Sequence, residues 1–165
     1  MFMKLRLKHT LSVLLLVGLT VLLPSCDSFN CPLDSTVAAV YNFYGSNGQA
    51  ITIGDTLTVT AMGTDQVLVN RLVNESTMSL PMSYYAEADT LIFTLADSEG
   101  RSSRDTLFVK KVSTPHSDDP SCPIHVWHQL TAVQHTYHLI DSVAIVNRAV
   151  NYDGLENIRI FFRTE

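Results

Sequence analysis

Apolar and polar side chains alternate with a period of two through most of this 165-residue chain, and this alternation constrains the fold more than any other feature. Leu57 and Val59 alternate with threonines in segment 56–61, and Ile158 and Ile160 alternate with more polar or aromatic neighbours near the C-terminus. Because successive side chains of a β-strand point to opposite faces, each such segment predicts a strand with one buried face. No segment of about eleven residues or more shows a convincing helical periodicity, so we expect an all-β fold.

Turn-forming sequences separate the alternating segments, in which β-branched and aromatic residues are frequent. The predicted strands are 37–44, 56–61, 67–73, 91–95, 105–112, 124–133, 142–146 and 158–163. The turn Asp97-Ser98-Glu99-Gly100 predicts a hairpin. Roughly seven to nine short strands with regularly spaced turns predict an antiparallel β-sandwich, with an immunoglobulin-like arrangement as one form and a small β-barrel as the alternative.

The first 25 residues have the pattern of a secretory signal peptide. Lys4, Arg6 and Lys8 make a positive start, and residues 11–23 form an apolar run broken by few polar or small residues. This run is too short for a comfortable membrane span but suits the apolar core of a signal peptide. We therefore expect residues 1–25 to be removed on export.

The apolar run leads into Leu23-Pro24-Ser25-Cys26. A small residue directly before a cysteine, with leucine two places earlier, resembles the lipobox of bacterial lipoproteins, in which the cysteine becomes the lipid-bearing first residue. The alternative is an ordinary signal peptide cut near Ser25. We expect residues 26–33 to be a lipidated N-terminus and tether, followed by a single β-rich domain over residues 34–165.

Charge excludes one class of partner. The predicted signal peptide holds three of the eleven basic residues and none of the sixteen acidic ones, so the mature chain has a net charge near −8. Proteins that bind nucleic acid neutralise phosphates with basic side chains, so we expect no nucleic-acid partner. The membrane is the expected partner, through a lipid on Cys26, because each buried methylene of an acyl chain contributes about 0.8 kcal/mol.

Two further cysteines, Cys31 and Cys122, remain for pairing if Cys26 carries a lipid. Each precedes a proline, which favours extended backbone at the cysteine. The cell envelope outside the inner membrane permits disulfides, so we predict a Cys31–Cys122 bridge. Two buried free thiols are the alternative.

A tripeptide of aspartate, a hydroxyl residue, and an aliphatic residue or threonine recurs along the chain. One interpretation is strand entry, with aspartate capping the preceding turn, the hydroxyl residue facing water and the aliphatic residue entering the core. The other comes from resemblance, because these triplets are similar to the acceptor sequence of the general O-glycosylation system of Bacteroidetes. The candidate acceptors are Ser35, Thr56, Thr90, Thr106 and Ser142.

Histidines gather in the C-terminal half, and His125, His128, His135 and His138 are the candidate metal ligands. On a regular strand, however, His125 and His128 point to opposite faces, so they cannot share an ion unless a bulge intervenes. We therefore expect ordinary imidazoles, no metal and no cofactor, and keep a metal site as the alternative. The chain has no Gly-x-Ser-x-Gly segment and no glycine-rich phosphate loop, so we expect it not to be an enzyme.

Three segments carry a resemblance to a family, and they are 31–34, 122–127 and 155–162. They are similar to a family of short, uncharacterised Bacteroidetes lipoproteins that consist of a domain of unknown function. The resemblance implies export, lipidation and a β-rich domain, and it implies no activity.

These expectations combine into a non-enzymatic envelope lipoprotein that acts as a structural or accessory binding module, with an envelope protein or a glycan as partner. Surface export in that bacterial group is associated with an acidic run after the lipidated cysteine, and here only Asp27 follows Cys26 before Ser28. We therefore expect an outer-membrane protein that faces the periplasm. A metal-binding lipoprotein that uses the histidines after Cys122 is the alternative function.

Overall fold

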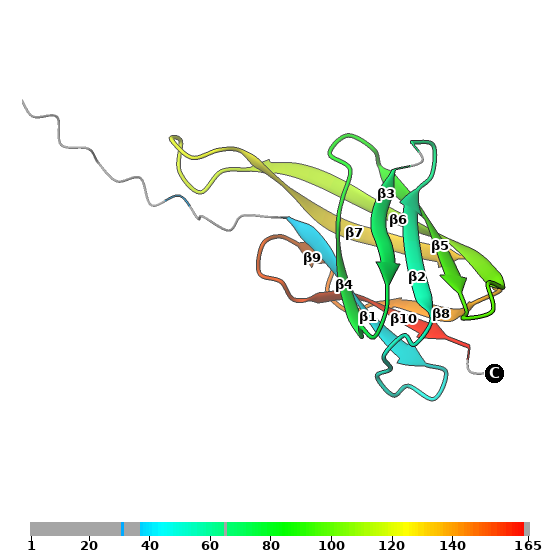
Figure 1. Cartoon of the computed structure of the whole chain (residues 1–165). Helices are drawn as coiled ribbons and strands as arrows, with labels where there is room; N and C mark the ends of the chain where they lie inside the picture. The colour runs from blue at the N-terminus through cyan, green and yellow to red at the C-terminus, as the bar shows by residue number, and fades with distance from the viewer. Residues whose placement is uncertain (1–30, 32–36, 65, 164–165) are drawn as a thin grey trace, which may run out of the picture. The chain divides into compact units, whose positions relative to one another are not determined.

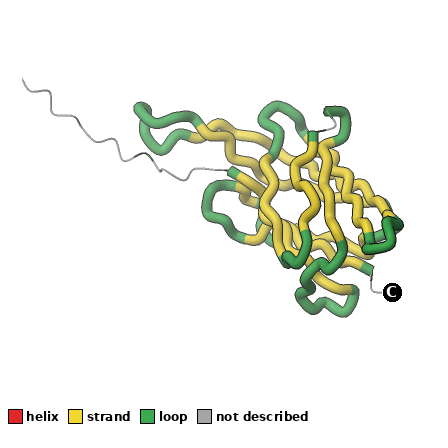
Figure 2. The backbone as a smooth tube through the Cα atoms, viewed as in Figure 1, coloured by secondary structure: helices red, strands yellow, loops and turns green. Residues whose placement is uncertain are grey.

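The computed structural model describes Cys31 and residues 37–64 and 66–163. The predicted lipid site Cys26 and the candidate acceptor Ser35 lie outside these residues. The described part of the unit Cys31–Glu165 contains ten strands and no helix (Figure 2). In chain order the strands are β1 (Ala38–Gly45), β2 (Thr56–Ala61), β3 (Val67–Leu72), β4 (Thr77–Pro81), β5 (Ala88–Ala96), β6 (Ser102–His116), β7 (His125–His135), β8 (Ile140–Ile145), β9 (Ala149–Val150) and β10 (Glu156–Phe162).

The strands form two sheets, and the all-β prediction is confirmed (Figure 1). The four-stranded sheet has the order β4-β1-β10-β8, and the six-stranded sheet has the order β3-β2-β5-β6-β7-β9. The strand pairing is antiparallel, as predicted, except that β1 and β10 run parallel. Parallel neighbours need a long connection, and here nearly the whole domain lies between the two strands, so local alternation could not reveal their direction.

Most predicted strands are present, and segment 56–61 has the predicted bounds. The sequence prediction missed β4 and β9, which are only five and two residues long. It also stopped short at both ends of β6, which has fifteen residues. Short strands give too few alternations to stand out from the turns beside them.

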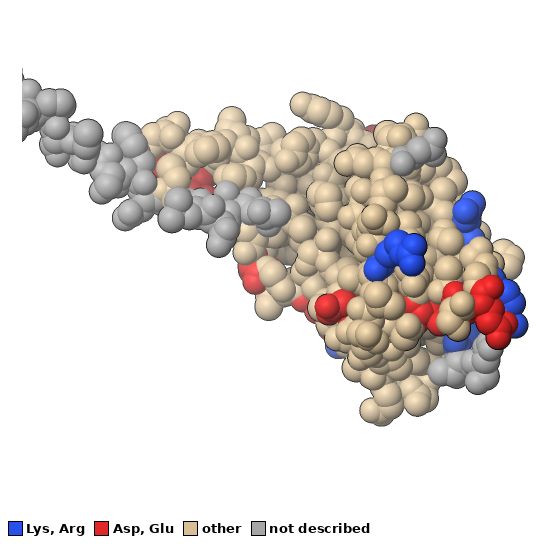
Figure 3. All heavy atoms as spheres, in the orientation of Figure 1, with Lys and Arg blue, Asp and Glu red and all other residues tan. Residues whose placement is uncertain are grey.

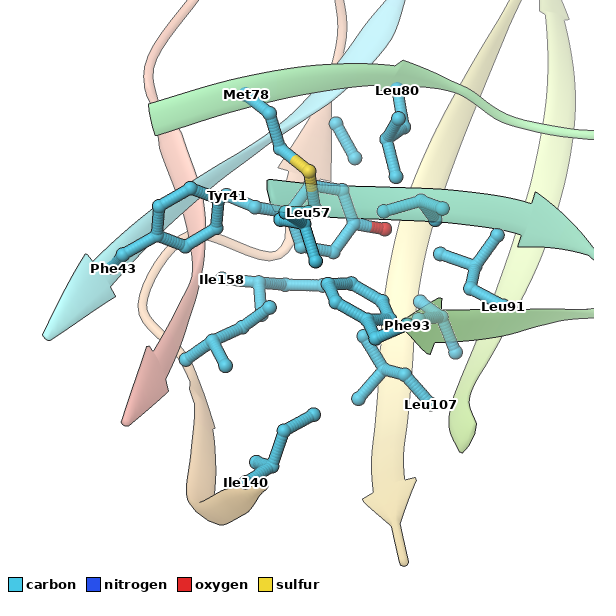
Figure 4. Packing of buried hydrophobic residues seen from close by; sticks show 14 of the residues in the cluster. Tyr41, Phe43, Leu57, Met78, Leu80, Leu91, Phe93, Leu107, Ile140 and Ile158 are labelled. Atoms are coloured by element: carbon cyan, nitrogen blue, oxygen red, sulfur yellow. The ribbon is translucent and has the colours of Figure 1, made fainter. Parts of the chain in front are cut away.

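The core lies between the two sheets, where apolar side chains from both inner faces meet (Figure 4). Tyr41 and Phe43 enter from β1 and Ile158 from β10, while Leu57 and Phe93 enter from the six-stranded sheet. All five are fully or almost fully buried. Burying a side chain of this size contributes about 2 kcal/mol, so the predicted inward rows supply the main stabilisation.

A β-bulge interrupts the pairing of β6 with β7. Lys110 pairs with Ala132 and Lys111 pairs with Leu130, so Thr131 is an extra residue in β7. A bulge of this kind changes which side chains of the strand face inward on its two sides. The long β6–β7 hairpin also runs past the neighbouring strand β5, which pairs only with Ser102–Lys110 of β6 (Figure 1).

Charged side chains are sparse on the face of the domain seen in Figure 3 and gather over the end where β5 turns into β6. In that turn the Nε of Arg101 lies 2.7 Å from the Oδ2 of Asp97. None of the described residues belongs to a helix long and apolar enough to cross a membrane.

Candidate functional site

A buried ion pair lies on the inner face of the six-stranded sheet. Lys111 of β6 has the same inward parity as the core residues before it, and its Nζ lies 2.8 Å from the Oδ2 of Asp89 on β5. The ammonium group also donates to the hydroxyl of Ser83 at 2.8 Å and to the carbonyl of Ala86 at 3.0 Å. These three acceptors occupy all three N–H bonds of the ammonium, which is the condition under which a buried charge is tolerated.

The same ion pair holds the segment that connects β4 to β5. Ser83 lies in this connection, and its hydroxyl also bonds to the carboxylate of Asp89. The backbone N–H of Lys111 donates to the carbonyl of Glu87 at 2.8 Å, which closes the connection against β6. Side-chain and backbone bonds therefore pin both ends of the segment to the edge of β6.

Two further polar groups lie near this pair. Burial, and next the charge of Asp89, raises the pKa of Tyr41, so its phenol stays protonated. Burial, and next the charge of Lys111, lowers the pKa of His128, which outweighs the opposite effect of Asp89. His128 is 3% exposed and is therefore a neutral imidazole at pH 7. Its Nδ1 shares a 2.9 Å hydrogen bond with the hydroxyl of Ser113, and its Nε2 has no partner among the described residues.

An open groove of about 710 Å³ runs between the β4–β5 connection and strand β6, and we call it the tyrosine groove. Tyr84 and Tyr85 form one side, and Lys110, Val112 and Ser113 are on the other. Tyr85 is 98% exposed, and its ring lies edge to face with that of Tyr84, 6.5 Å between centroids. An exposed aromatic pair beside backbone and side-chain polar groups can bind a ligand that has both apolar faces and hydrogen-bonding groups.

A second groove of about 480 Å³ lies against the same connection, and Tyr84 and Ala86 line both grooves. Ser83 and Asp89 line only this second groove, and Lys111 and Ser113 line only the first. The two grooves therefore lie on either side of the β4–β5 connection, and the Lys111–Asp89 ion pair links one groove to the other.

The side-chain alternation of the sequence already placed Asp89 and Lys111 on the inward faces of their strands, although the sequence prediction did not use this. Asp89 has the parity of Leu91, and Lys111 has the parity of Val109, so both charged residues occupy inward positions of their strands. Asp89 lies two residues before the predicted strand 91–95, and Lys111 lies within the predicted strand 105–112. Opposite charges with inward parity in one predicted hairpin indicate a buried ion pair.

The candidate metal ligands do not converge. The β6–β7 register pairs His125 with His116 and pairs His128 with Ser113, so His125 and His128 belong to opposite faces, as predicted. The bulge at Thr131 changes the side-chain parity between His128 and His135, so a regular alternation does not relate these two histidines.

Each of the other two histidines has its own partner. The Nδ1 of His135 lies 2.8 Å from the carbonyl of Thr136, and the Nδ1 of His138 lies 3.0 Å from the Oδ1 of Asp105. No group of three or more histidines, cysteines or acidic residues within the described ranges could hold a metal ion. The structure therefore does not support His125, His128, His135 and His138 as a metal site, because the strand and the turn after it point them apart.

The recurring triplets have two different structural roles. Leu57, Leu91 and Leu107 are buried, as strand entry requires. Asp89 and Asp105, however, point into the sandwich. Asp89 still accepts hydrogen bonds from Ser83 in the connection before β5, as the capping interpretation predicted. Asp105 is the fourth residue of β6 and bonds to the turn between β7 and β8, so it does not cap the turn before its own strand. Among the described acceptor candidates, Thr56, Thr90 and Thr106 are half-buried and Ser142 is exposed.

Asp105 accepts hydrogen bonds across the turn between β7 and β8. The backbone N–H groups of His138, Leu139 and Ile140 donate to its carboxylate at 2.7 to 3.0 Å, and the hydroxyl of Thr136 donates at 2.5 Å. Burial by itself would raise the pKa of Asp105, but these bonds outweigh it and lower the pKa to about 2. Asp105 is thus an ionised anchor for the turn.

The predicted disulfide is present between Cys31 and Cys122, with 5.6 Å between the Cα atoms. It links Cys31, which precedes β1, to the loop between β6 and β7. Next to this loop is an aromatic cluster in which the ring of Trp127 stacks on that of His116 and meets that of Tyr152 edge to face. The ring of Trp127 thus packs with His116 and Tyr152, and Trp127 does not line the tyrosine groove.

Comparison with known proteins gives a family and no function. No curated protein and no solved structure matches the chain significantly, so the immunoglobulin-like form of the sandwich stays a prediction. The model of the Family of unknown function (DUF6452) matches residues 56–162. This range holds segments 122–127 and 155–162 of the resemblance but not segment 31–34. Because the match covers more than half of its length, the chain belongs to this family of unknown function.

Proposed function

We propose that the protein is an envelope lipoprotein, held on a membrane by a lipid on Cys26, whose β-domain is a non-enzymatic binding module. The ligand, a segment of an envelope protein or of a glycan, binds in the tyrosine groove. The observation that carries the binding proposal is the exposed Tyr84–Tyr85 pair beside a groove of about 710 Å³.

The build of the groove supports binding. Large exposed aromatic side chains beside a concavity are typical of interaction sites rather than of ordinary surface. The ion pair of Lys111 and Asp89, with Ser83 and Ala86, holds the connection that carries the tyrosines. A preorganised site loses less conformational entropy when the ligand binds.

The same contacts speak against covalent chemistry in this groove. The charge of Lys111 is matched by Asp89, and its three N–H bonds are occupied, so it is not available as a base or as an anion site. His128 contacts Ser113, but its second nitrogen is buried and meets no orienting carboxylate among the described residues.

The anchor is tested on the protein isolated from membranes. Mass spectrometry of the N-terminal peptide is expected to show an acylated Cys26 as the first residue, and the Cys26→Ser variant should leave the membrane fraction or remain as the uncleaved precursor. A Cys31→Ser/Cys122→Ser variant is the matched control, since it also loses cysteines but should keep the lipid. An unmodified thiol on Cys26 in the native product would refute the anchor.

The binding site is tested by photo-crosslinking in intact cells, because this samples the partner in its own compartment. A photoreactive phenylalanine derivative replaces Tyr85, and the control carries the same group at Tyr137, which is 64% exposed but lies in a different groove. We expect a discrete adduct at Tyr85 that is absent at Tyr137 and that weakens when Lys110→Ala is added. Equal adducts at both positions, or none at either, would contradict binding in the tyrosine groove.

The proposal includes an outer-membrane location that faces the periplasm. Membrane fractionation should then place the acylated protein in the outer membrane, and protease added to intact cells should not cleave it until the outer membrane is permeabilised.

A further inference from the structure

The disulfide changes where the domain is attached to its anchor. Cys122 lies in the loop between β6 and β7, so a chain that enters from Cys26 is first tied to this loop rather than to β1. Cys31 follows Cys26 by five residues, which span at most about 18 Å. Without the disulfide, the first strand residue on the tether would be Ala38, and twelve residues reach about 43 Å.

Beside this attachment lies a compact aromatic cluster whose three rings are half-buried. The rings of Trp127 and His116 stack with 3.4 Å between centroids, and Tyr152 packs on Trp127 at 5.7 Å. The hydroxyl of Tyr152 donates to the carboxylate of Asp118 at 2.6 and 2.7 Å, which ties the β9–β10 connection to the β6–β7 loop. Ile124 beside the cluster is 71% exposed. Tryptophan and tyrosine are enriched where proteins meet the polar layer of a membrane.

The charged side chains of this surface limit how deeply it can enter a lipid bilayer. The hydrogen bond from Tyr152 lowers the pKa of Asp118 and outweighs the opposite effect of burial, and the bond with His116 lowers it further. Hydrogen bonds from Ser121 lower the pKa of Asp119. Both carboxylates are therefore ionised at neutral pH, and ionised carboxylates are costly in hydrocarbon. Contact at the head groups is compatible with them, and insertion is not.

We propose that this end of the domain, formed by residues 116–127 and Tyr152 and here called the loop end, rests on the head-group surface of the membrane that holds Cys26. The inference depends on the proposed anchor, because the lipid supplies the membrane and the disulfide brings the loop end to it. The opposite end, where β5 turns into β6, then points away from the bilayer.

The chain contains one tryptophan, Trp127, and it lies in the loop end, so its fluorescence reports this contact directly. The acylated protein, purified from membranes with its disulfide intact, is reconstituted into phosphatidylcholine vesicles that carry a nitroxide on the head group. We expect strong quenching of Trp127 relative to vesicles without the nitroxide. Quenching no greater than that of the unlipidated domain mixed with the same vesicles would overturn the proposal.

A relocated tryptophan is the matched control. The Trp127→Phe/Phe108→Trp variant moves the fluorophore eight residues along β6 from His116, which is about 26 Å of strand. Phe108 is 36% exposed, so a tryptophan at this position is accessible to a quencher that reaches it. We expect this variant to lose most of the quenching, whereas equal quenching at both positions would mean that the domain has no preferred orientation and would refute the proposal.

A second variant keeps every contact of the folded domain and lengthens only the tether. An insertion of about 20 glycine and serine residues after Asp27 adds about 25 Å of root-mean-square reach. We expect it to reduce the quenching of Trp127, and unchanged quenching would refute the short tether as the cause. Mass spectrometry of the same preparations separates the two proposals, because a bare Cys26 refutes the anchor, whereas an acylated Cys26 with unquenched Trp127 refutes only the orientation.

Discussion

Asp89 and Asp105 begin two copies of the same tripeptide on neighbouring strands, and both point into the sandwich, yet they stabilise different things. Asp105 accepts bonds from three backbone N–H groups and a hydroxyl, and it fixes the turn between β7 and β8. Asp89 meets the ammonium group of Lys111 and the hydroxyl of Ser83, and it holds the connection that carries the tyrosine groove. Identical local sequence therefore serves the fold in one place and the candidate site in the other.

Removing the carboxylate of Asp105 should have the largest effect. Asp105→Ala leaves buried backbone N–H groups without an acceptor, and each such group costs about 1 to 3 kcal/mol. We expect the free energy of unfolding to fall by about 4 kcal/mol, measured by urea denaturation. Asp141→Ala is the control, because Asp141 starts another triplet but is exposed. Equal losses for both variants would remove the distinction between buried and exposed triplets.

Breaking the ion pair should come next. Asp89→Ala leaves the ammonium group of Lys111 buried without its counter-ion, and we expect a loss of about 3 kcal/mol. The Asp89→Leu/Lys111→Met double variant removes both charges and should return to within about 1 kcal/mol of the parent. In both variants, amide hydrogen exchange of residues 82–87 should become faster. Unchanged exchange in that segment would show that Asp89, like Asp105, serves only the fold.

Acid separates the contribution of Asp105 from other effects on stability. Its pKa falls from 3.8 in a free chain to about 2 in the folded protein, so the carboxylate stabilises the fold fully above pH 3.8. As the pH falls from 3.8 towards 2, this contribution of about 2 kcal/mol disappears. The parent should therefore lose more stability over this range than the Asp105→Asn variant. Parallel curves of unfolding free energy against pH would contradict this role.

Modification should show the smallest effect on stability. Since Asp89 and Asp105 are engaged inside the sandwich, the triplet with both Asp141 and Ser142 exposed is the most accessible of the candidate acceptors in the described part of the chain. We expect a glycan mass on the native protein that Ser142→Ala abolishes and Thr106→Val does not, with stability changed by less than about 0.5 kcal/mol. A glycan on Thr106 would show that modification precedes folding.

Much of the fold could be predicted from particular residues. The alternation around Leu57 and Val59 predicted β2. The disulfide was predicted because Cys31 and Cys122 were the two cysteines left for pairing in an exported protein. The short strands β4 and β9 escaped, because two to five residues hold too little pattern. The groove escaped as well, because the exposed tyrosines of a loop line a groove only when β6 lies beside them.

The alternation of side chains by itself determined that this protein is built of strands with one buried face, since a period of two leaves no other regular structure. The sequence also predicted the pairing of Cys31 with Cys122, which the structure confirms. Tertiary structure alone decided the parallel pairing of β1 with β10, the bulge at Thr131 and the bonds of Asp105 to the turn between β7 and β8. These features depend on which backbone groups of distant segments come together in the folded protein. Such contacts leave no periodic pattern in the sequence.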